Sequence, residues 1–331
     1  MAEPFDEPIV DFRHFIYGKA EDRQAVVPEV GDALWSNGFF YLSGHGIEQA
    51  KIDEAFAWSK RFFHLPKEQK QSIVEYMLPG NETIRGHISS KEGFGVGNPA
   101  IHPPDNHWPF EEALPGFREF MESFWKDCAQ LLHPLFECLT IALRLDESNA
   151  FSKFHATSRF RLNLLHYPAS EAGIYTGPRM AAHSDTSTLT LMFQETTAGD
   201  STDGLEIGDR STVSSSTTAA TFTKRGGVFR AAKPIEGTVL VSAGHALNLW
   251  APLRWVSAIH RVAGPTRQQC REGRTAPERF SIPTFAYPDR GTIIEPLPGE
   301  WRSDAPKRLE PLDFDAYLEK KNAETTVQRS V

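Results

Sequence analysis

The chain has little cysteine and lacks any segment that would carry it across a membrane. Cys128, Cys138 and Cys270 are an odd, sparse set in 331 residues, which favours free thiols in a reducing compartment over a disulfide framework. The N-terminus is acidic and has no apolar signal core, and no run approaches the ~18 uninterrupted apolar residues of a membrane span. These absences predict a cytoplasmic protein with no membrane partner.

A surplus of positive charge is also missing. The formal net charge is −8 and the isoelectric point is about 5.9, so the chain lacks the basic excess that nucleic-acid phosphates attract. Hydrophobic residues make up 40% of the chain, which permits one large domain or two small ones. No pattern indicates an obligate protein partner.

The first half of the chain has helical periodicity and the second half reads as short strands. Residues 48–63 and 117–143 place apolar side chains at intervals of three and four, as amphipathic helices do. From about Arg159 the pattern changes to short strands separated by turns, including an alternating run over 188–193. Residues 312–323 have helix-forming composition. Many short strands with turns predict a sandwich or a closed barrel.

One segment interrupts the strand-rich half. Residues 196–227 contain a polar stretch of low complexity, 211–218, beside a strand-like run at 204–207. Compact domains rarely carry so long a loop. Two interpretations stay open, a solvated insertion or a lid over an active-site mouth. We favour the solvated insertion, because residues 208–226 carry little that could be buried, so their deletion should cost little stability.

Two histidines and one aspartate form the most informative pattern. His183 and Asp185 are two residues apart, so in a strand they project to the same side. His260 lies far along the chain, and a barrel or jelly roll would bring it next to His183 and Asp185 in space. Two imidazoles and one carboxylate on one face of an ion are the signature of non-haem Fe(II) oxygenases. Each histidine has an ordinary packing role as its alternative, but the ordered motifs downstream favour the iron site.

A second pair of residues is suited to an anion. Arg279 and Ser281 also share one face of a strand-like run, and a guanidinium fork beside a hydroxyl binds a carboxylate well. A buried arginine is costly without such a partner. Either a protein carboxylate or a bound dicarboxylic acid must therefore satisfy Arg279.

Taken in order, these motifs resemble the 2-oxoglutarate/Fe(II)-dependent dioxygenases, in particular the isopenicillin N synthase-like subfamily. Further landmarks of that family lie at residues 8–12, 37–47, 62–66 with Lys70, 106–109 and 161–168. Two segments depart from it. Ser-Ala-Gly-His at 242–245 replaces Asn-x-Gly-Asp, and Leu-Trp-Ala-Pro at 249–252 replaces Arg-Trp-(Ser/Thr)-Asn. Neither departure removes a ligand, although both bear on the rim of the site.

The resemblance implies a mainly β fold with flanking α-helices, namely a double-stranded β-helix (jelly roll) core with N-terminal helices. It divides the chain into three parts. Residues 1–150 form an N-terminal helical region that packs on the core and is not independent, residues 155–290 form the jelly-roll core, and residues 291–331 form a C-terminal helix and tail.

The resemblance also implies the cofactors. Fe(II) would be held by His183, Asp185 and His260, and 2-oxoglutarate would chelate the iron as cosubstrate, with dioxygen in the remaining position. The distal carboxylate of 2-oxoglutarate would bind Arg279, Ser281 and Tyr167. No catalytic residue beyond the metal centre is implied. His166 precedes Tyr167 and faces the other side of the strand, which favours a packing role for His166.

The implied activity is that of a 2-oxoglutarate-dependent dioxygenase, an oxidoreductase that hydroxylates, desaturates or cyclises a small organic molecule, with secondary metabolism as a family-level expectation. Two alternatives stay open. One is an iron oxidase of the isopenicillin N synthase type that uses no 2-oxoglutarate, and the other is a non-catalytic jelly-roll binding protein. Candidate residues of the substrate pocket are mostly apolar or aromatic: Leu189, Leu191, Phe193, Phe285, Tyr287, Arg85, His87 and Phe94.

Overall fold

A computed structural model describes most of the chain. The described residues are 8–73, 76–79, 83–84, 87–101, 107–145, 150–171, 177–195, 204–210, 218–252, 254–297 and 310–325. Among these residues no helix is long and apolar enough to cross a membrane. The three cysteines are free thiols, as expected, and all three are buried.

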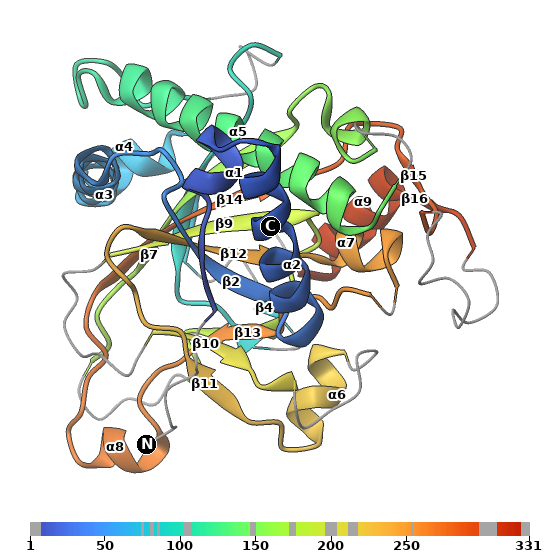
Figure 1. The fold of residues 1–331 in the computed structure, drawn as a ribbon. Coiled ribbons are helices and arrows are strands. Elements are labelled where there is room, and N and C mark those ends of the chain that lie inside the picture. Colours follow the sequence, from blue (N-terminus) through green and yellow to red (C-terminus); the bar gives the residue numbers. More distant parts are fainter. Residues whose placement is uncertain are drawn as a thin grey trace.

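Two β-sheets form the centre of the molecule (Figure 1). The major sheet has eight strands in the order β1 (Ile9–Asp11), β2 (Phe39–Ser43), β12 (Thr238–Ala243), β9 (Leu189–Gln194), β14 (Arg279–Ala286), β7 (Phe160–Tyr167), β6 (Glu92–Val96) and β3 (Tyr76–Met77). The minor sheet has four strands in the order β11 (Phe229–Ala231), β10 (Leu205–Gly208), β13 (His260–Val262) and β8 (Met180–His183). All neighbours pair antiparallel except β1 and β2.

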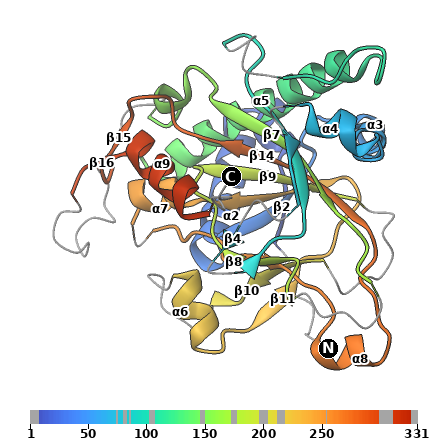
Figure 2. The same ribbon diagram turned by 180° about the vertical axis from the view of Figure 1, so that it is seen from behind.

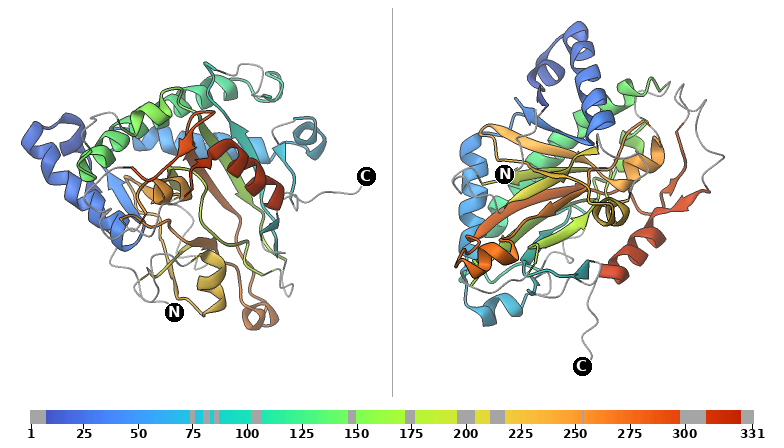
Figure 3. Two further views of the ribbon diagram at one scale, coloured as in Figure 1. Left: turned by 90° about the vertical axis from the view of Figure 1, so that its right-hand side faces the viewer. Right: turned by 90° about the horizontal axis from the view of Figure 1, so that it is seen from below.

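The helices lie mainly outside the sheets. They are α1 (Arg13–Tyr17), α2 (Ala20–Ser36), α3 (Gln49–Phe63), α4 (Lys67–Gln71), α5 (Phe117–Ala142), a 3₁₀ turn (Ser152–His155), α6 (Ala219–Lys224), α7 (His245–Trp250), α8 (Arg267–Arg271) and α9 (Phe314–Thr325). Figure 3 shows the blue and green N-terminal helices gathered on one side of the strands, opposite the yellow α6. Two short hairpins complete the described fold, β4 (Thr83–Ile84) with β5 (His87–Ile88) and β15 (Ile293–Ile294) with β16 (Leu312–Asp313).

Each face of the major sheet has its own apolar cluster. On the outer face, the predicted apolar stripes of α3 and α5 pack on the strands, for example through the rings of Phe124 and Phe193, 5.3 Å apart. On the inner face, Tyr41 and Met192 belong to one apolar cluster with Ile207 of the minor sheet. The two sheets therefore face each other across an apolar layer. This arrangement confirms the jelly-roll core with flanking helices.

The segment after β9 is only partly the solvated insertion that its composition suggested. Gly208 ends β10, which pairs with both β11 and β13, so the expected strand at 204–207 is central to the minor sheet. Phe222 of α6 is fully buried against Ile259 and Phe229. Arg210 is also buried, and it donates to the Ser257 carbonyl at 2.6 Å. The expectation that residues 208–226 bury little was therefore wrong. Residues 211–217, the centre of the polar stretch, lie outside the described residues.

Candidate functional site

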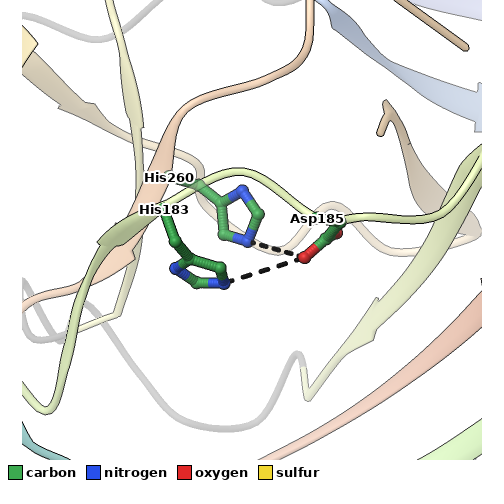
Figure 4. A group of neighbouring side chains, drawn as sticks. All are labelled: His183, Asp185 and His260. Atoms are coloured by element: carbon green, nitrogen blue, oxygen red, sulfur yellow. Dashed lines mark ion pairs between the residues drawn. The ribbon is translucent and has the colours of Figure 1, made fainter. Parts of the chain in front are cut away.

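Three side chains converge between the two sheets (Figure 4). His183 ends β8, Asp185 lies in the turn that follows, and His260 begins β13 and pairs with His183 across the minor sheet. Oδ1 of Asp185 lies 3.7 Å from Nε2 of His183 and 3.6 Å from Nε2 of His260. The three potential ligand atoms all lie within 4.8 Å of one another. They can therefore surround a single metal ion.

Backbone contacts set the orientation of both imidazoles. Nδ1 of His183 donates to the Ala181 carbonyl at 2.9 Å, and Nδ1 of His260 donates to the Ala258 carbonyl at 3.3 Å. With the hydrogen on Nδ1, each ring keeps a free lone pair on Nε2, and a metal ion can bind this lone pair. Burial, and then the nearby His260, hold the pKa of His183 well below its usual value, which favours the neutral imidazole.

The carboxylate of Asp185 has its own support, which the sequence reading missed. Oγ1 of Thr190 donates to Oδ2 of Asp185 at 2.7 Å, so Oδ1 is left to face the histidines. The backbone N–H of His245 donates to the Asp185 carbonyl at 2.7 Å. A Cβ at Gly244 would lie 1.9 Å from the Ser187 carbonyl oxygen, so only glycine permits this close approach. The Ser-Ala-Gly-His departure thus still holds the Asp185 turn in place.

Arg279 is a buried cation at the other end of the inner face. Its side chain donates to Oγ of Ser281 at 3.2 Å and to Oε1 of Gln194 at 3.4 Å, and its guanidinium lies 5.3 Å from the centre of the Tyr167 ring. No described carboxylate forms an ion pair with it. Burial lowers the pKa of Arg279, while Tyr167 and Glu195 act to raise it. The predicted Arg279, Ser281 and Tyr167 are thus brought together around an unneutralised guanidinium.

Tyr167 is held firmly beside this guanidinium. It is 1% exposed, and its hydroxyl lies 3.5 Å from Sδ of Met180 in the minor sheet. The buried Arg179 donates to the carbonyls of Tyr167 and Pro168 at 2.6 and 2.7 Å. Arg279 and Tyr167 are also paired in register across β14 and β7. Neither Met180 nor Arg179 carried a signal in the sequence.

Two of the predicted pocket residues lie at the metal end of the inner face. Phe285 pairs in register with Thr190, the residue that supports Asp185, and its ring stacks on Tyr287 with centroids 6.0 Å apart. Burial, and next the nearby Asp185, raise the pKa of Tyr287 to about 12. Tyr287 in turn contacts Phe314 of α9, 6.4 Å between centroids. Figure 2 shows α9 beside α7, at this end of the strands.

Other pocket candidates lie elsewhere. Leu189, Leu191, Phe193 and Phe94 all belong to the core on the outer face. The prediction assumed one continuous strand from His183 to Phe193, but β8 ends at His183 and β9 begins at Leu189. The turn between them changes the parity, so the prediction was wrong for Leu189, Leu191 and Phe193. It was also wrong for Phe94 of β6, whose ring contacts the outer-core rings of Phe62 and Phe117. His87 hydrogen-bonds the Pro178 carbonyl, and Arg85 lies outside the described residues.

Two polar residues on the inner face were not anticipated as pocket candidates. Arg161 and Asn163 share the parity of Tyr167 on β7, and Arg161 pairs in register with Phe285. A Cβ at Gly95 would lie 2.3 Å from the Arg161 guanidinium, so the side chain crosses β6 where only glycine leaves room. Oδ1 of Asn163 is buried and has no hydrogen-bond partner among the described residues. Strand parity with Tyr167 was the signal that could have identified both.

Comparisons with known proteins agree with this geometry. Residues 8–111 match the family model described as the non-haem dioxygenase in morphine synthesis N-terminal region, and residues 160–288 match the 2OG-Fe(II) oxygenase superfamily. The 2-oxoglutarate-dependent dioxygenase frbA of Dothideomycetidae sp. (strain 11243) is 31% identical over 318 residues, which cover 88% of each chain. The proline hydroxylase buaE of Petromyces alliaceus is 30% identical over 310 residues, which cover 87% of this chain and 89% of its own.

Solved structures share the fold. A full-length Neurospora crassa protein, solved in complex with alpha-KG, superposes with a TM-score of 0.80 at 27% identity, covering 96% of each chain. The dioxygenase for auxin oxidation in rice superposes with a TM-score of 0.70 at 20% identity, and that likeness concerns the fold alone.

Proposed function

This chain belongs to the 2OG-Fe(II) oxygenase superfamily, and from that premise we propose which of its residues carry the reaction and what kind of molecule they accept. The chain is a 2-oxoglutarate-dependent dioxygenase that acts on a small molecule, with Fe(II) as cofactor and 2-oxoglutarate as cosubstrate. When bound, iron would activate dioxygen with electrons from 2-oxoglutarate, which is oxidised to succinate and carbon dioxide, and dioxygen would thereby supply the oxidant for a substrate C–H bond.

The metal is proposed to bind His183, Asp185 and His260. Their donor atoms fit one ion, and each is oriented by a separate contact with Ala181, Thr190 or Ala258. Two nitrogens and one oxygen on the same side leave the opposite side open for cosubstrate and dioxygen.

The single observation that carries the cosubstrate proposal is the burial of Arg279 without a described carboxylate partner. Arg279 is 9% exposed, and among the described residues its guanidinium makes two long hydrogen bonds and no ion pair, so its burial is costly unless an anion neutralises it. The distal carboxylate of 2-oxoglutarate supplies that anion. Ser281 and Tyr167 stand beside the guanidinium with hydroxyls that can donate to the same carboxylate.

The register of the inner face separates the cosubstrate end from the substrate end. Along β14, Arg279 pairs with Tyr167 at one end and Phe285 pairs with Arg161 at the other. Six residues of strand span about 20 Å. Because Thr190 pairs with Phe285 and also supports the metal ligand Asp185, the metal lies toward the Phe285 end. 2-Oxoglutarate therefore extends from Arg279 toward the metal, and the substrate meets the metal from the side of Phe285 and Arg161.

The substrate proposed for this end is a small organic molecule with both an apolar and a polar part. Phe285 and Tyr287 offer stacked aromatic faces. Asn163 offers a buried oxygen that is free to accept a hydrogen bond from a substrate, and Arg161 carries positive charge on the same face. We infer hydroxylation, desaturation or cyclisation of such a molecule in secondary metabolism. The proline hydroxylase among the relatives supports hydroxylation in particular.

Succinate formation tests this function. Protein loaded with Fe(II) should convert 2-oxoglutarate to succinate in the presence of dioxygen, slowly without substrate. His183→Ala, Asp185→Ala and His260→Ala should each abolish the conversion and keep the fold. His14→Ala, an exposed histidine on α1, is the matched control and should behave as wild type. Full succinate formation in any of the three site variants would refute the metal assignment. Turnover of a substrate without succinate would favour the 2-oxoglutarate-independent oxidase.

A further inference from the structure

A cluster of buried charged residues lies on the outer face of the major sheet, behind the Arg279–Tyr167 pair. It contains Lys70 of α4, Glu92 of β6 and His166 of β7, which are 7%, 5% and 6% exposed. Burial of an ionised group costs several kcal/mol even after relaxation, and apolar side chains would pack in the same place without that cost. The position of this cluster therefore calls for a reason beyond stability.

His166 is the centre of the cluster. Its Nδ1 lies 2.6 Å from Oε1 of Glu92, and its Nε2 lies 2.7 Å from Oε1 of Glu278, the residue before β14. Burial alone would raise the pKa of both glutamates, but hydrogen bonds hold both values below the usual one. For Glu92 the first of these contacts is with His166, and for Glu278 they are with His64 and then His166. Each ring nitrogen of His166 thus contacts the carboxylate of one glutamate, so the imidazole joins Glu92 to Glu278.

The remaining contacts fix Glu92 firmly. Nζ of Lys70 donates to both carboxylate oxygens of Glu92, at 2.8 and 3.1 Å, and to the Phe63 carbonyl at 2.7 Å. The hydroxyl of Tyr76 donates to Oε2 of Glu92. Glu92 is thus held in a fixed position, and His166, which contacts both glutamates, holds Glu278 in place relative to Glu92.

Strand register links this cluster to the cosubstrate clamp. Glu92 pairs with His166, and His166 pairs with Phe280, on which its ring stacks with centroids 4.6 Å apart. Tyr167 follows His166, and Arg279 follows Glu278. Since neighbours in a strand project to opposite faces, fixing His166 on the outer face fixes the backbone that carries Tyr167 and Arg279 on the inner face.

Arg279 needs such external support. Its two side-chain contacts measure 3.2 and 3.4 Å, at the long end of hydrogen bonds, and β14 begins at Arg279 itself. The first residue of a strand is prone to fray. The place of the guanidinium therefore depends on the backbone that Glu278 anchors.

We propose that His166, by bridging Glu92 and Glu278, is a positioning residue that aligns Arg279 and Tyr167 with the distal carboxylate of 2-oxoglutarate. The inference rests on the proposed function of Arg279 as the clamp. In this view the buried charges of the cluster are retained because they fix the ends of three neighbouring strands, β6, β7 and β14, in one register.

A pair of ligands tests the inference. 2-Oxoglutarate and 2-oxobutanoate share the 2-oxo acid that chelates iron, but only 2-oxoglutarate has a distal carboxylate. Anaerobic binding of each to the Fe(II)-loaded full chain is followed by the charge-transfer absorption of the chelate. His166→Phe keeps an aromatic ring on Phe280 and removes both bridges. Glu278→Gln, at a site 41% exposed in the side chain, is the milder variant should His166→Phe fail to fold.

Both variants should bind 2-oxoglutarate roughly tenfold more weakly, the lower range for loss of a supporting partner at a metal site. Binding of 2-oxobutanoate should not change, and with 2-oxoglutarate the KM should rise while kcat at saturation stays constant. Two controls are matched. His64→Gln removes an exposed contact to the same Glu278, and His155→Gln perturbs another buried histidine, so neither should change the preference between the two acids.

A double variant separates the possible failures. In an Arg279→Ala background, His166→Phe should weaken 2-oxoglutarate binding much less than it does in wild type, because the guanidinium, the charged one of the two aligned groups, is gone. Equal losses for both acids, or an additive loss on top of Arg279→Ala, would overturn the positioning role. If Arg279→Ala weakens 2-oxoglutarate binding while His166→Phe and Glu278→Gln do not, only this inference fails. If Arg279→Ala itself has no effect, the proposed clamp fails, and the inference fails with it.

Discussion

Thr190→Val should weaken iron binding without unfolding the protein. The valine keeps the shape of threonine but removes the hydroxyl that donates to Oδ2 of Asp185 at 2.7 Å. A hydrogen bond to a charged group contributes about 1.5–3 kcal/mol. The freed carboxylate loses its fixed orientation toward His183 and His260. Loss of such a supporting partner costs roughly ten- to a hundredfold in metal affinity.

The assay is an anaerobic titration of the apoprotein with Fe(II), read against a competing chelator of known affinity. Thr140→Val is the matched control, because its Oγ1 also makes a buried hydrogen bond, to the Phe136 carbonyl at 2.9 Å, but lies on α5 in the outer core. Thr140→Val should lower the melting temperature and leave Fe(II) affinity intact. If Thr190→Val binds Fe(II) as tightly as wild type, Thr190 does not orient Asp185 and the reasoning is refuted.

Three further predictions concern stability. Phe222→Ala should cost about 3–5 kcal/mol of unfolding free energy, since it empties a fully buried site under α6. An unchanged denaturation midpoint would instead support the interpretation of this segment as a solvated insertion. Burial lowers the pKa of His155 from 6.5 to about 4, so on acidification the unfolded chain binds a proton at this histidine before the folded protein does. The free energy of unfolding should therefore fall by up to about 3 kcal/mol as the pH drops from 6.5 to about 4. In His155→Phe, the urea midpoint should depend less on pH over this range. Adding Fe(II) at about a hundred times its dissociation constant should stabilise wild type by about 2.7 kcal/mol, and a melting-temperature rise that persists in His183→Ala would place the metal elsewhere.

The sequence was sufficient where the chemistry is local. His183 and Asp185 are two residues apart, but Asp185 lies in the turn after β8, so strand parity does not account for that pair. Arg279 and Ser281 both lie on β14 with the same spacing, so strand parity alone predicts that they share one face. The apolar spacing of residues 117–143 likewise predicted α5, which spans Phe117–Ala142. For β14 and α5 the period of the backbone fixes which side chains share a face, so no tertiary information was needed.

The sequence failed where parity depends on an irregular turn or on a distant partner. Because of the turn between β8 and β9, Leu191 projects to the outer face and not to the predicted inner face, and no residue of the turn indicates this change in the sequence. Phe222 reads as one aromatic residue in a polar stretch, and its burial depends on Ile259 of another segment. The bridge from Glu92 through His166 to Glu278 joins three segments far apart in the sequence, so only the sheet register reveals it.

The affinity of the Fe(II)-loaded protein for 2-oxoglutarate under anaerobic conditions, compared between wild type and Arg279→Ala, tests the central claim most directly. Loss of a buried charge-assisted pair costs about 2–5 kcal/mol, so the dissociation constant should rise by a factor of roughly thirty to several thousand. Arg279→Lys should recover only part of the loss, because an ammonium cannot reproduce the guanidinium fork. An Arg279→Ala protein that binds 2-oxoglutarate as tightly as wild type would contradict the account.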